Sequence, residues 1–348
     1  MKKLIFVCIA ACTMLFSCKK AEPRIVIISF DGLRWQELYS GADTALVTDT
    51  RFVKDTTALK AEFWRDTPEE RREVLAPFYW SYVKDHGYML GNRYKNSLMQ
   101  VSNAMHFSYP GYSEMFSGYP DDERISSNAD KANPNHTVIE ALQEDSRYKG
   151  KTLVYCSWEV IRNAVNVGRA GIPANLRRTT HNLIEIPGLD ITDIERDATT
   201  FSGAITSIIK DHPSALYIGV GDTDKWGHNE RYDLYLKSIH VQDAYIRKLV
   251  ETCESDPYYK GKTTYVLTCD HGRGDGPQFT DHWYTIPGSD KTWFMTFGAG
   301  VPALGETTDN GPFWTKQFAA TIAKITGIDF TPDNGVKPEP FDPTFKGE

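Results

Sequence analysis

Residues 263–273 read Thr-Thr-Tyr-Val-Leu-Thr-Cys-Asp-His-Gly-Arg, an apolar, β-branched run that ends abruptly in Asp270, His271 and Gly272. The run predicts a strand that is buried on both faces of a parallel sheet. In open α/β sheets, ligands bind at the carboxyl ends of the strands, where this carboxylate and this imidazole would lie. Both groups suit a divalent metal. A strand-end Asp paired with a nearby cation, next to a surface His, would give the same pattern.

A second strand is predicted at residues 25–30, where another β-branched run ends in Asp31 and Gly32. Gly32 would let the backbone turn sharply next to a ligand. Asp31 is therefore a further candidate ligand, although by itself it could be a helix cap or a turn residue.

A third strand, within residues 214–221, also leads to an acid and a histidine. Asp224 and His228 follow it four residues apart, and we expect Gly227 to allow a turn between them. Asp222 competes with Asp224 for the role of metal ligand. A later polar loop adds His282 as a candidate.

The segment around Ser108 predicts a nucleophile at the start of a helix. Ser108-Tyr-Pro-Gly111 is an ordinary arrangement for a helix N-terminus. A hydroxyl there would also face unpaired backbone N–H groups and the positive end of the helix dipole, a setting that suits phosphate. Ser113 and Ser117 are lesser candidates because each is expected on or inside the helix.

These candidates share a place at strand or helix ends, and they are Asp31, Ser108, Asp224, His228, Asp270, His271 and His282. Converging carboxylates would repel one another, by about 4 kcal/mol for two charges ~4 Å apart. Two divalent metals would remove that cost, activate a nucleophile and stabilise both oxygens of an in-line displacement. The set therefore suits phosphoryl or sulfuryl transfer.

The rest of the chain predicts one domain over residues 24–348 in which strands and helices alternate. We expect a loop and then a solvated helix over 40–75, helices over 76–90, 137–142, 200–210, 233–252 and 313–325, strands at 152–158 and 293–302, and an irregular insertion near 165–200. His181, His240 and Asp243 are expected to be surface or structural residues.

The N-terminus resembles a bacterial lipoprotein signal. A positive start and a short apolar run lead to Leu15-Phe16-Ser17-Cys18. This predicts a signal peptide at 1–17, lipidation of Cys18, a tether at 18–23 and export to the cell envelope. A simple secretory signal is the alternative.

Charge and cysteine content exclude two classes of protein. The net charge is −7 and no basic block is present, so no nucleic-acid-binding surface is evident. Cys156, Cys253 and Cys269 have no metal-motif spacing, and we expect no disulfide framework.

The order of these motifs resembles the alkaline phosphatase superfamily, in particular its nucleotide pyrophosphatase/phosphodiesterase-like and single-domain phosphatase branch. The motifs are Phe-Asp31-Gly, Ser108-Tyr-Pro-Gly, Asp224-Lys-Trp-Gly-His228, Asp270-His271-Gly and a later His282. The resemblance implies a three-layer α/β/α fold with a mostly parallel central sheet. It also implies two divalent metals, most simply zinc: one held by Asp224, His228 and His282, the other by Asp31, Asp270 and His271. Ser108 would bridge both metals and form a covalent phosphoserine.

The chain departs from the family pattern at three places. Gly111 stands where the nucleotide phosphodiesterases have an Asn that contacts a phosphoryl oxygen, and Asn128 could take that role. Arg162 could supply the Arg of a Lys-x-Arg pair whose Lys is missing here, or it could form a surface salt bridge. Sulfatases carry an Arg at the place of Tyr112, which argues against a sulfatase.

These features predict an exported two-metal phosphoric ester hydrolase, a phosphatase or phosphodiesterase acting on a small phosphate ester. A pyrophosphatase or phosphotransferase of the same superfamily is an alternative. A catalytically inactive surface binding protein is the alternative from another class.

Overall fold

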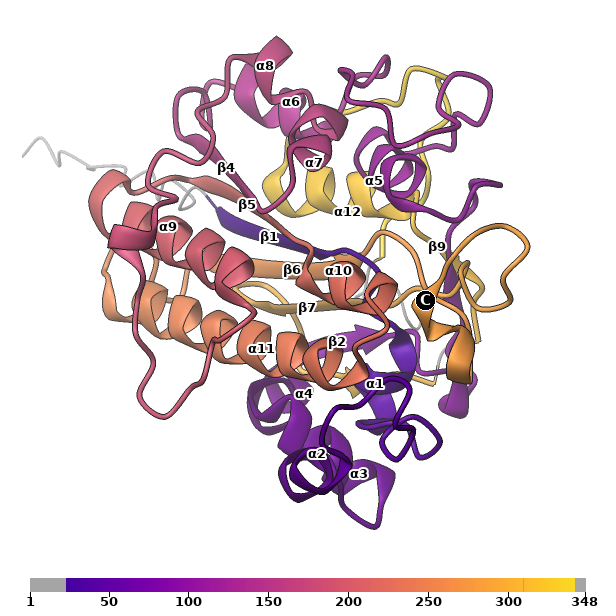
Figure 1. The fold of residues 1–348 in the computed structure, drawn as a ribbon. Helices are drawn as coiled ribbons and strands as arrows, with labels where there is room; N and C mark the ends of the chain where they lie inside the picture. The colour runs from indigo at the N-terminus through magenta and orange to yellow at the C-terminus, as the bar shows by residue number, and fades with distance from the viewer. Residues whose placement is uncertain (1–22, 309, 342–348) are drawn as a thin grey trace, which may run out of the picture.

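The computed structural model describes residues 23–308 and 310–341. A seven-stranded sheet with the order β4-β5-β1-β6-β7-β2-β8 forms its centre (Figure 1). The strands of this sheet are β1 (Arg24–Phe30), β2 (Gly87–Leu90), β4 (Thr152–Cys156), β5 (Ala215–Val220), β6 (Thr263–Cys269), β7 (Phe294–Gly298) and β8 (Gly305–Glu306). A second sheet pairs β3 (Met99–Gln100) with β9 (Phe313–Trp314). The predicted signal peptide, Cys18 and most of the tether lie outside the described residues.

The strands predicted to be buried on both faces are the central ones. β4, β5, β1 and β6 run parallel, whereas β7 is antiparallel to β6 and to β2. Successive β1 side chains enter two different cores, with Ile25 and Ile27 in one and Val26 and Ile28 in the other. This alternation follows from the period-two geometry of a strand, and it explains why the run is apolar throughout.

Helices cover both faces of the sheet, as Figure 1 shows. One face carries α9 (Glu195–Asp211) and α11 (Tyr232–Ser255), and the other carries α5 (Ser108–Ser117), α6 (Val138–Glu144), α7 (Glu159–Ala164) and α12 (Gln317–Thr326). The remaining helices are α1 (Trp35–Ser40), α2 (Thr56–Phe63), α3 (Pro68–Leu75), α4 (Lys84–His86), α8 (Val167–Ala170), α10 (Asp222–His228), the π-helix η1 (Tyr79–Val83) and the 3-10 turns η2 (Arg93–Lys95), η3 (Thr180–Asn182) and η4 (Gly276–Thr280). The predicted three-layer α/β/α class with a mostly parallel sheet is confirmed.

The region 40–90 differs from its prediction. Residues 56–75 form two helices rather than one, and the charged residues of α3 are not all solvated. Arg72 is buried because it pairs with Glu306 at 2.9 Å and lies over the ring of Trp80. The helix expected over 76–90 ends early, and Gly87 starts β2. A Cβ at Gly87 would lie 2.5 Å from a backbone oxygen of β7, so this close pairing requires glycine.

The expected insertion is shorter than predicted. Residues 167–170 are helical, and α9 already begins at Glu195. Its start is set by Asp197, whose carboxylate accepts hydrogen bonds from the backbone N–H groups of Gly221 and Asp222 at 3.1 and 2.9 Å. At the C-terminal end, α12 begins only at Gln317, because Phe313 and Trp314 pair with β3.

Two further observations concern cysteines and membrane spans. Cys156, Cys253 and Cys269 are free and buried, as expected for small apolar side chains in strands and helices. Within the described ranges, we find no helix with the length and apolar character needed to cross a bilayer.

Asp243 is a buried structural residue, which is one of the two roles expected from the sequence. Its carboxylate lies in α11 and accepts the backbone N–H groups of Phe78 and Tyr79 at 2.9 and 3.0 Å. Burial raises the pKa of Asp243 to about 7, against the opposing effect of these two hydrogen bonds. The folded protein therefore binds a proton there between about pH 4 and pH 7 that the unfolded chain releases.

We predict that this carboxyl lowers the stability of the protein as the pH rises. The unfolding free energy of the wild type should fall by about 2 kcal/mol or more between pH 4.5 and pH 7.5, relative to Asp243→Asn. Urea unfolding of both proteins at the two pH values measures this difference. Asp55→Asn, at an exposed cap of α2, controls for the change of a capping carboxylate. Equal pH dependence in wild type and Asp243→Asn would contradict the prediction.

Candidate active site

The register of three parallel strands places the site. Phe30 of β1 pairs with Val220 of β5 on one side and with Cys269 of β6 on the other. The next residues along each strand, Asp31, Gly221 and Asp270, therefore lie at one edge of the sheet. The carboxyl edge expected from the sequence is thus where the acidic side chains meet.

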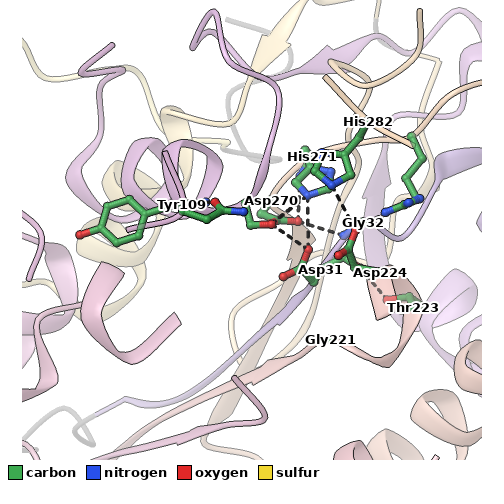
Figure 2. A network of polar contacts seen from close by, with 12 residues as sticks. Asp31, Gly32, Tyr109, Gly221, Thr223, Asp224, Asp270, His271 and His282 are labelled. Carbon is green, nitrogen blue, oxygen red and sulfur yellow. Dashed lines mark hydrogen bonds and ion pairs between the residues drawn. The ribbon is translucent and has the colours of Figure 1, made fainter. Parts of the chain in front are cut away.

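A first cluster, defined as Asp31, Asp270 and His271, is fully buried at this edge. His271 Nε2 lies 3.3 Å from Asp31 Oδ1 and 3.5 Å from Asp270 Oδ2. Figure 2 shows these side chains pointing toward one another. Asp270 Oδ1 accepts the backbone N–H groups of Gly32 and His271 at 3.0 and 2.9 Å, whereas Asp270 Oδ2 is buried without a hydrogen-bond donor.

A second cluster, defined as Asp224, His228 and His282, lies beside the first. His228 Nε2 is 2.9 Å from His282 Nε2, and both nitrogens are 3.4 Å from the Asp224 carboxylate. Asp224 and His228 occupy the same face of α10, since they are four residues apart on a helix. The rings of His271 and His282 stack with centroids 4.0 Å apart, so the two clusters adjoin.

The histidine tautomers show what the clusters can hold. His271 Nδ1 is 2.7 Å from the carbonyl oxygen of Gly272, and His282 Nδ1 is 3.3 Å from that of His106. A carbonyl only accepts, so each Nδ1 carries the proton and, in the neutral ring, each Nε2 presents a lone pair. The Nε2 atoms of His271 and His282 face carboxylate oxygens. Against the effect of burial, the charge of Asp270 and the hydrogen bond and charge of Asp31 raise the pKa of His271 to about 9, so a proton occupies a place that a metal ion could take. Two groups of donors, Asp31 with Asp270 and His271, and Asp224 with His271 and His282, are each close enough together to hold a metal ion, so the site fits metal binding.

Burial and neighbouring charges shift the pKa values of the three carboxylates. Burial, followed by the charge of Asp224, raises the pKa of Asp31, and burial together with the charge of Asp31 raises that of Asp270. Burial also acts to raise the pKa of Asp224, but the charges of Arg273 and the surrounding histidines hold it below its usual value. In the first cluster, the positive charge of His271 acts to lower the pKa of Asp31 and Asp270 but does not offset their burial.

Ser108 is the first residue of α5 and lies against the first cluster. Its Oγ is 3.3 Å from Asp31 Oδ1 and 3.3 Å from His271 Nε2. The lesser candidates lie elsewhere in the helix, with Ser113 near Asn133 and Ser117 bonded to the Tyr119 carbonyl oxygen.

The expected array of unpaired N–H groups beside Ser108 is a wrong prediction. The Tyr109 N–H donates to Asn128 Oδ1 at 2.8 Å, and Pro110 has no N–H. Asn128 therefore lies next to Ser108, where it caps α5 through its side-chain oxygen. Gly111 stands in place of an Asn because a Cβ there would lie 2.4 Å from the carbonyl oxygen of Asp270.

Two other candidates are held away from the clusters. The side chain of Arg162, in α7, pairs with Glu159 at 2.8 Å, and its Nε is buried without an acceptor. Asp222, the competitor of Asp224, accepts Arg196 Nε at 3.0 Å and the backbone N–H of Asp197 at 3.0 Å. These bonds engage both of its carboxylate oxygens in holding the start of α9, so Asp222 is structural.

Arg273 is a residue that the sequence reasoning missed. Its fully buried guanidinium contacts Asp224 and donates to the carbonyl oxygens of Phe279 and Thr280 at 2.5 and 2.7 Å. It thus ties the ligand helix α10 to the loop that leads to His282. The only sequence signal is its position directly after Asp-His-Gly.

Gly227 does not form the turn expected between Asp224 and His228. It lies inside α10 and makes no turn, because Asp224 and His228 share one helix. A Cβ at Gly227 would lie 2.6 Å from Arg273 Nε, so glycine there makes room for the guanidinium. Gly32 has a similar role, since its φ is +60° and a Cβ would lie 2.8 Å from Asp224 Oδ1.

Solved structures with the same fold are alkaline phosphatase-like. A putative sulfatase from Bacteroides thetaiotaomicron VPI-5482 aligns with a TM-score of 0.61 and 12% identity over 94% of this chain and 75% of that one. The lipoteichoic acid synthase LtaP from Listeria monocytogenes gives 0.57 and 9% over 91% and 75%. The wild-type alkaline phosphatase PafA gives 0.55 and 11% over 92% and 98%. At these identities the likeness establishes the fold.

The sequence comparisons supply the family. A model described as the metalloenzyme superfamily matches residues 47–286, which is more than half of the chain. The chain belongs to the metalloenzyme superfamily, and it has an alkaline phosphatase-like fold. No curated protein sequence matches it. The resemblance to the alkaline phosphatase superfamily is thus confirmed at the level of the fold, and the family is one of metal-dependent enzymes.

We predict that Asp270→Asn removes one metal equivalent from the zinc-loaded protein, because Asp270 Oδ2 has no other partner in the site. Elemental analysis of the purified variant measures the loss. Asp222→Asn is the matched control, since Asp222 lies at the same sheet edge but its oxygens are bonded to α9. It should keep both equivalents. Two equivalents retained by Asp270→Asn would contradict the ligand role.

Proposed function

We propose that the protein is an exported two-metal hydrolase of phosphoric esters that acts through a covalent phosphoserine on Ser108. The observation that carries this proposal is the position of the Ser108 Oγ, 3.3 Å from both Asp31 and His271 of the first cluster. A hydroxyl held there can attack a phosphoryl group bound at the same edge of the sheet.

Two zinc ions are the proposed cofactors. The second cluster would hold one and the first cluster the other, since nitrogen and carboxylate ligands in sets of three leave room for substrate at a zinc ion. Bound metals would supply a lowered pKa for the attacking hydroxyl and stabilise the attacking and leaving oxygens. The second ring nitrogens of His271 and His282, bonded to carbonyl oxygens, keep both rings oriented for this.

The proposed reaction has two displacements at phosphorus. Ser108 Oγ bonds to phosphorus as the ester P–O bond breaks, the serine proton passes to solvent, and the alcohol leaves with a proton from solvent. Water then attacks the phosphoserine, the P–Oγ bond breaks and Ser108 regains a proton. The carboxylates of the site need not change their charge during either step.

Substrate contacts are proposed for Asn128 and Arg162. The Asn128 side-chain oxygen is engaged with the Tyr109 N–H, which leaves its amide N–H groups to donate to a phosphoryl oxygen beside Ser108. The unpaired Nε of Arg162 could donate to another phosphoryl oxygen if the side chain turns away from Glu159.

A phosphoryl rather than a sulfuryl group is favoured by α5. Tyr112, at the place where sulfatases carry an Arg, is fully buried in the apolar core. It therefore offers no cation to a sulfate at the site.

The choice between a monoester and a diester substrate stays open. The absent Lys beside Arg162 weakens the case for a monoester, and Gly111 weakens the case for a nucleotide diester. Transfer to an alcohol acceptor in place of water is the second candidate reaction, and an inactive binding protein is a further alternative.

We also propose that the chain is exported and anchored to lipid through Cys18, with the domain in the cell envelope. The basis is the lipobox-like run Leu15-Phe16-Ser17-Cys18.

We predict that Ser108→Ala lowers turnover of the better of two substrates, p-nitrophenyl phosphate and bis-p-nitrophenyl phosphate, by at least about 10³-fold in the presence of zinc. The reason is that no hydroxyl remains to accept the phosphoryl group. Ser113→Ala is the matched control, because Ser113 is a buried hydroxyl of the same helix that contacts Asn133 instead of the clusters. It should keep most of the activity. Full activity in Ser108→Ala would reject the proposed nucleophile.

A separate prediction concerns export. Cys18→Ser in the expressing cell should move the protein from the membrane fraction to the soluble envelope fraction, because the residue that receives the lipid is lost. Fractionation with detection by antibody measures this. An unchanged membrane fraction would contradict the lipid anchor.

A further inference from the structure

Three aromatic side chains lie in contact next to the site in sequence, and we call Phe107, Trp283 and Tyr284 the aromatic platform. The rings of Phe107 and Trp283 are parallel, with centroids 4.7 Å apart and an interplanar angle of 5°. Tyr284 lies next to Trp283 at 5.6 Å, tilted by 47°.

The platform is built from residues that adjoin the proposed catalytic groups. Phe107 directly precedes Ser108, and Trp283 directly follows His282. The loops that carry them are held together by the contact of His282 Nδ1 with the His106 carbonyl oxygen, at 3.3 Å. The backbone N–H of Trp283 also donates to Ser289 Oγ at 3.1 Å. These contacts hold the backbone on both sides of the platform, and the stack on Phe107 orients the indole.

Exposure differs sharply across the platform. Phe107 is 2% exposed, whereas Trp283 is 39% and Tyr284 59% exposed. One face of the Trp283 indole rests on Phe107, so its exposed area belongs to the opposite face and the edge. Trp and Tyr side chains that keep an exposed face are enriched where proteins contact ligands and partners.

We propose that this exposed indole face, extended by Tyr284, binds an aromatic ring in the alcohol portion of the phosphoric ester. The inference rests on the proposed function and adds to it the class of substrate. A ring placed on the outer face of Trp283 would continue the parallel stack that Phe107 begins, and such stacking tolerates different ring types. An aryl group and a nucleobase share this chemistry.

Binding of three phosphonates to the zinc-loaded protein, measured by calorimetry, tests the proposal without turnover. Benzylphosphonate carries the ring, cyclohexylmethylphosphonate has similar size without an aromatic face, and methylphosphonate reports the metal site alone. We expect benzylphosphonate to bind more tightly than the other two. Trp283→Ala should weaken it by about tenfold and change methylphosphonate by less than about twofold, and Trp283→Phe should retain most of the preference.

Tyr82→Ala is the matched control. Tyr82 is a half-buried ring that stacks on the buried Phe78, with centroids 5.2 Å apart and an angle of 11°. It also packs against Phe297, which pairs with Tyr265 near the amino end of β6. The candidate site lies at the carboxyl end of that strand. This variant should leave all three affinities unchanged. A nucleoside 5′-phosphonate then separates the two sources of the ring, because only a nucleobase site would prefer it over the benzyl compound.

The outcomes separate this inference from the proposed function. Equal binding of the benzyl and methyl compounds, or equal weakening of both by Trp283→Ala, would overturn the aromatic site and leave the phosphoesterase proposal intact. A Trp283-dependent preference for a pyranosyl phosphonate or for phosphocholine over the benzyl compound would show that the platform takes a sugar or a quaternary ammonium group instead. Binding of none of these compounds, together with no hydrolysis of any phosphate ester, would reject both proposals.

Discussion

The structure depends on a group of carboxylates and imidazoles that converge at the carboxyl edge of the sheet. Asp31, Asp224 and Asp270 converge there, and the nitrogens of His228 and His282 lie 2.9 Å apart. Without positive charge between them these groups repel one another, because burial removes the water that would screen them. Bonds outside the clusters hold several of these groups in place, such as those of the His271 and His282 Nδ1 atoms to carbonyl oxygens.

The scaffold that holds this volume is made of close backbone approaches. The in-register ends of β5, β1 and β6 bring Gly221, Asp31 and Asp270 to one line. Helix α5 can then approach Asp270 only because residue 111 is glycine, and the guanidinium of Arg273 reaches Asp224 only because residue 227 is glycine. These positions need no side chain of their own, yet they decide where the nucleophile and the ligands lie.

Much of the fold and of the candidate site could be predicted from local sequence. Apolar runs such as 25–30 and 263–269 identify central strands because both faces of such strands are buried. The residue that ends each run then identifies a candidate ligand, since all parallel strands present their carboxyl ends at one edge. Prediction failed where a partner far away in the sequence decides whether a group is buried or hydrogen-bonded. Arg72 is buried against Glu306, and the Tyr109 N–H is paired with Asn128.

The sequence by itself determined the α/β class, the strand ends and the candidate groups, because these follow from hydrophobic periodicity and from the chemistry of each side chain. The tertiary structure alone decided that Asp224 rather than Asp222 faces the site, and that Arg273 compensates its charge. It alone placed Trp283 on Phe107. The physical reason is that these contacts join residues far apart in the chain, and their partners are set by strand register and helix packing, which no local pattern encodes.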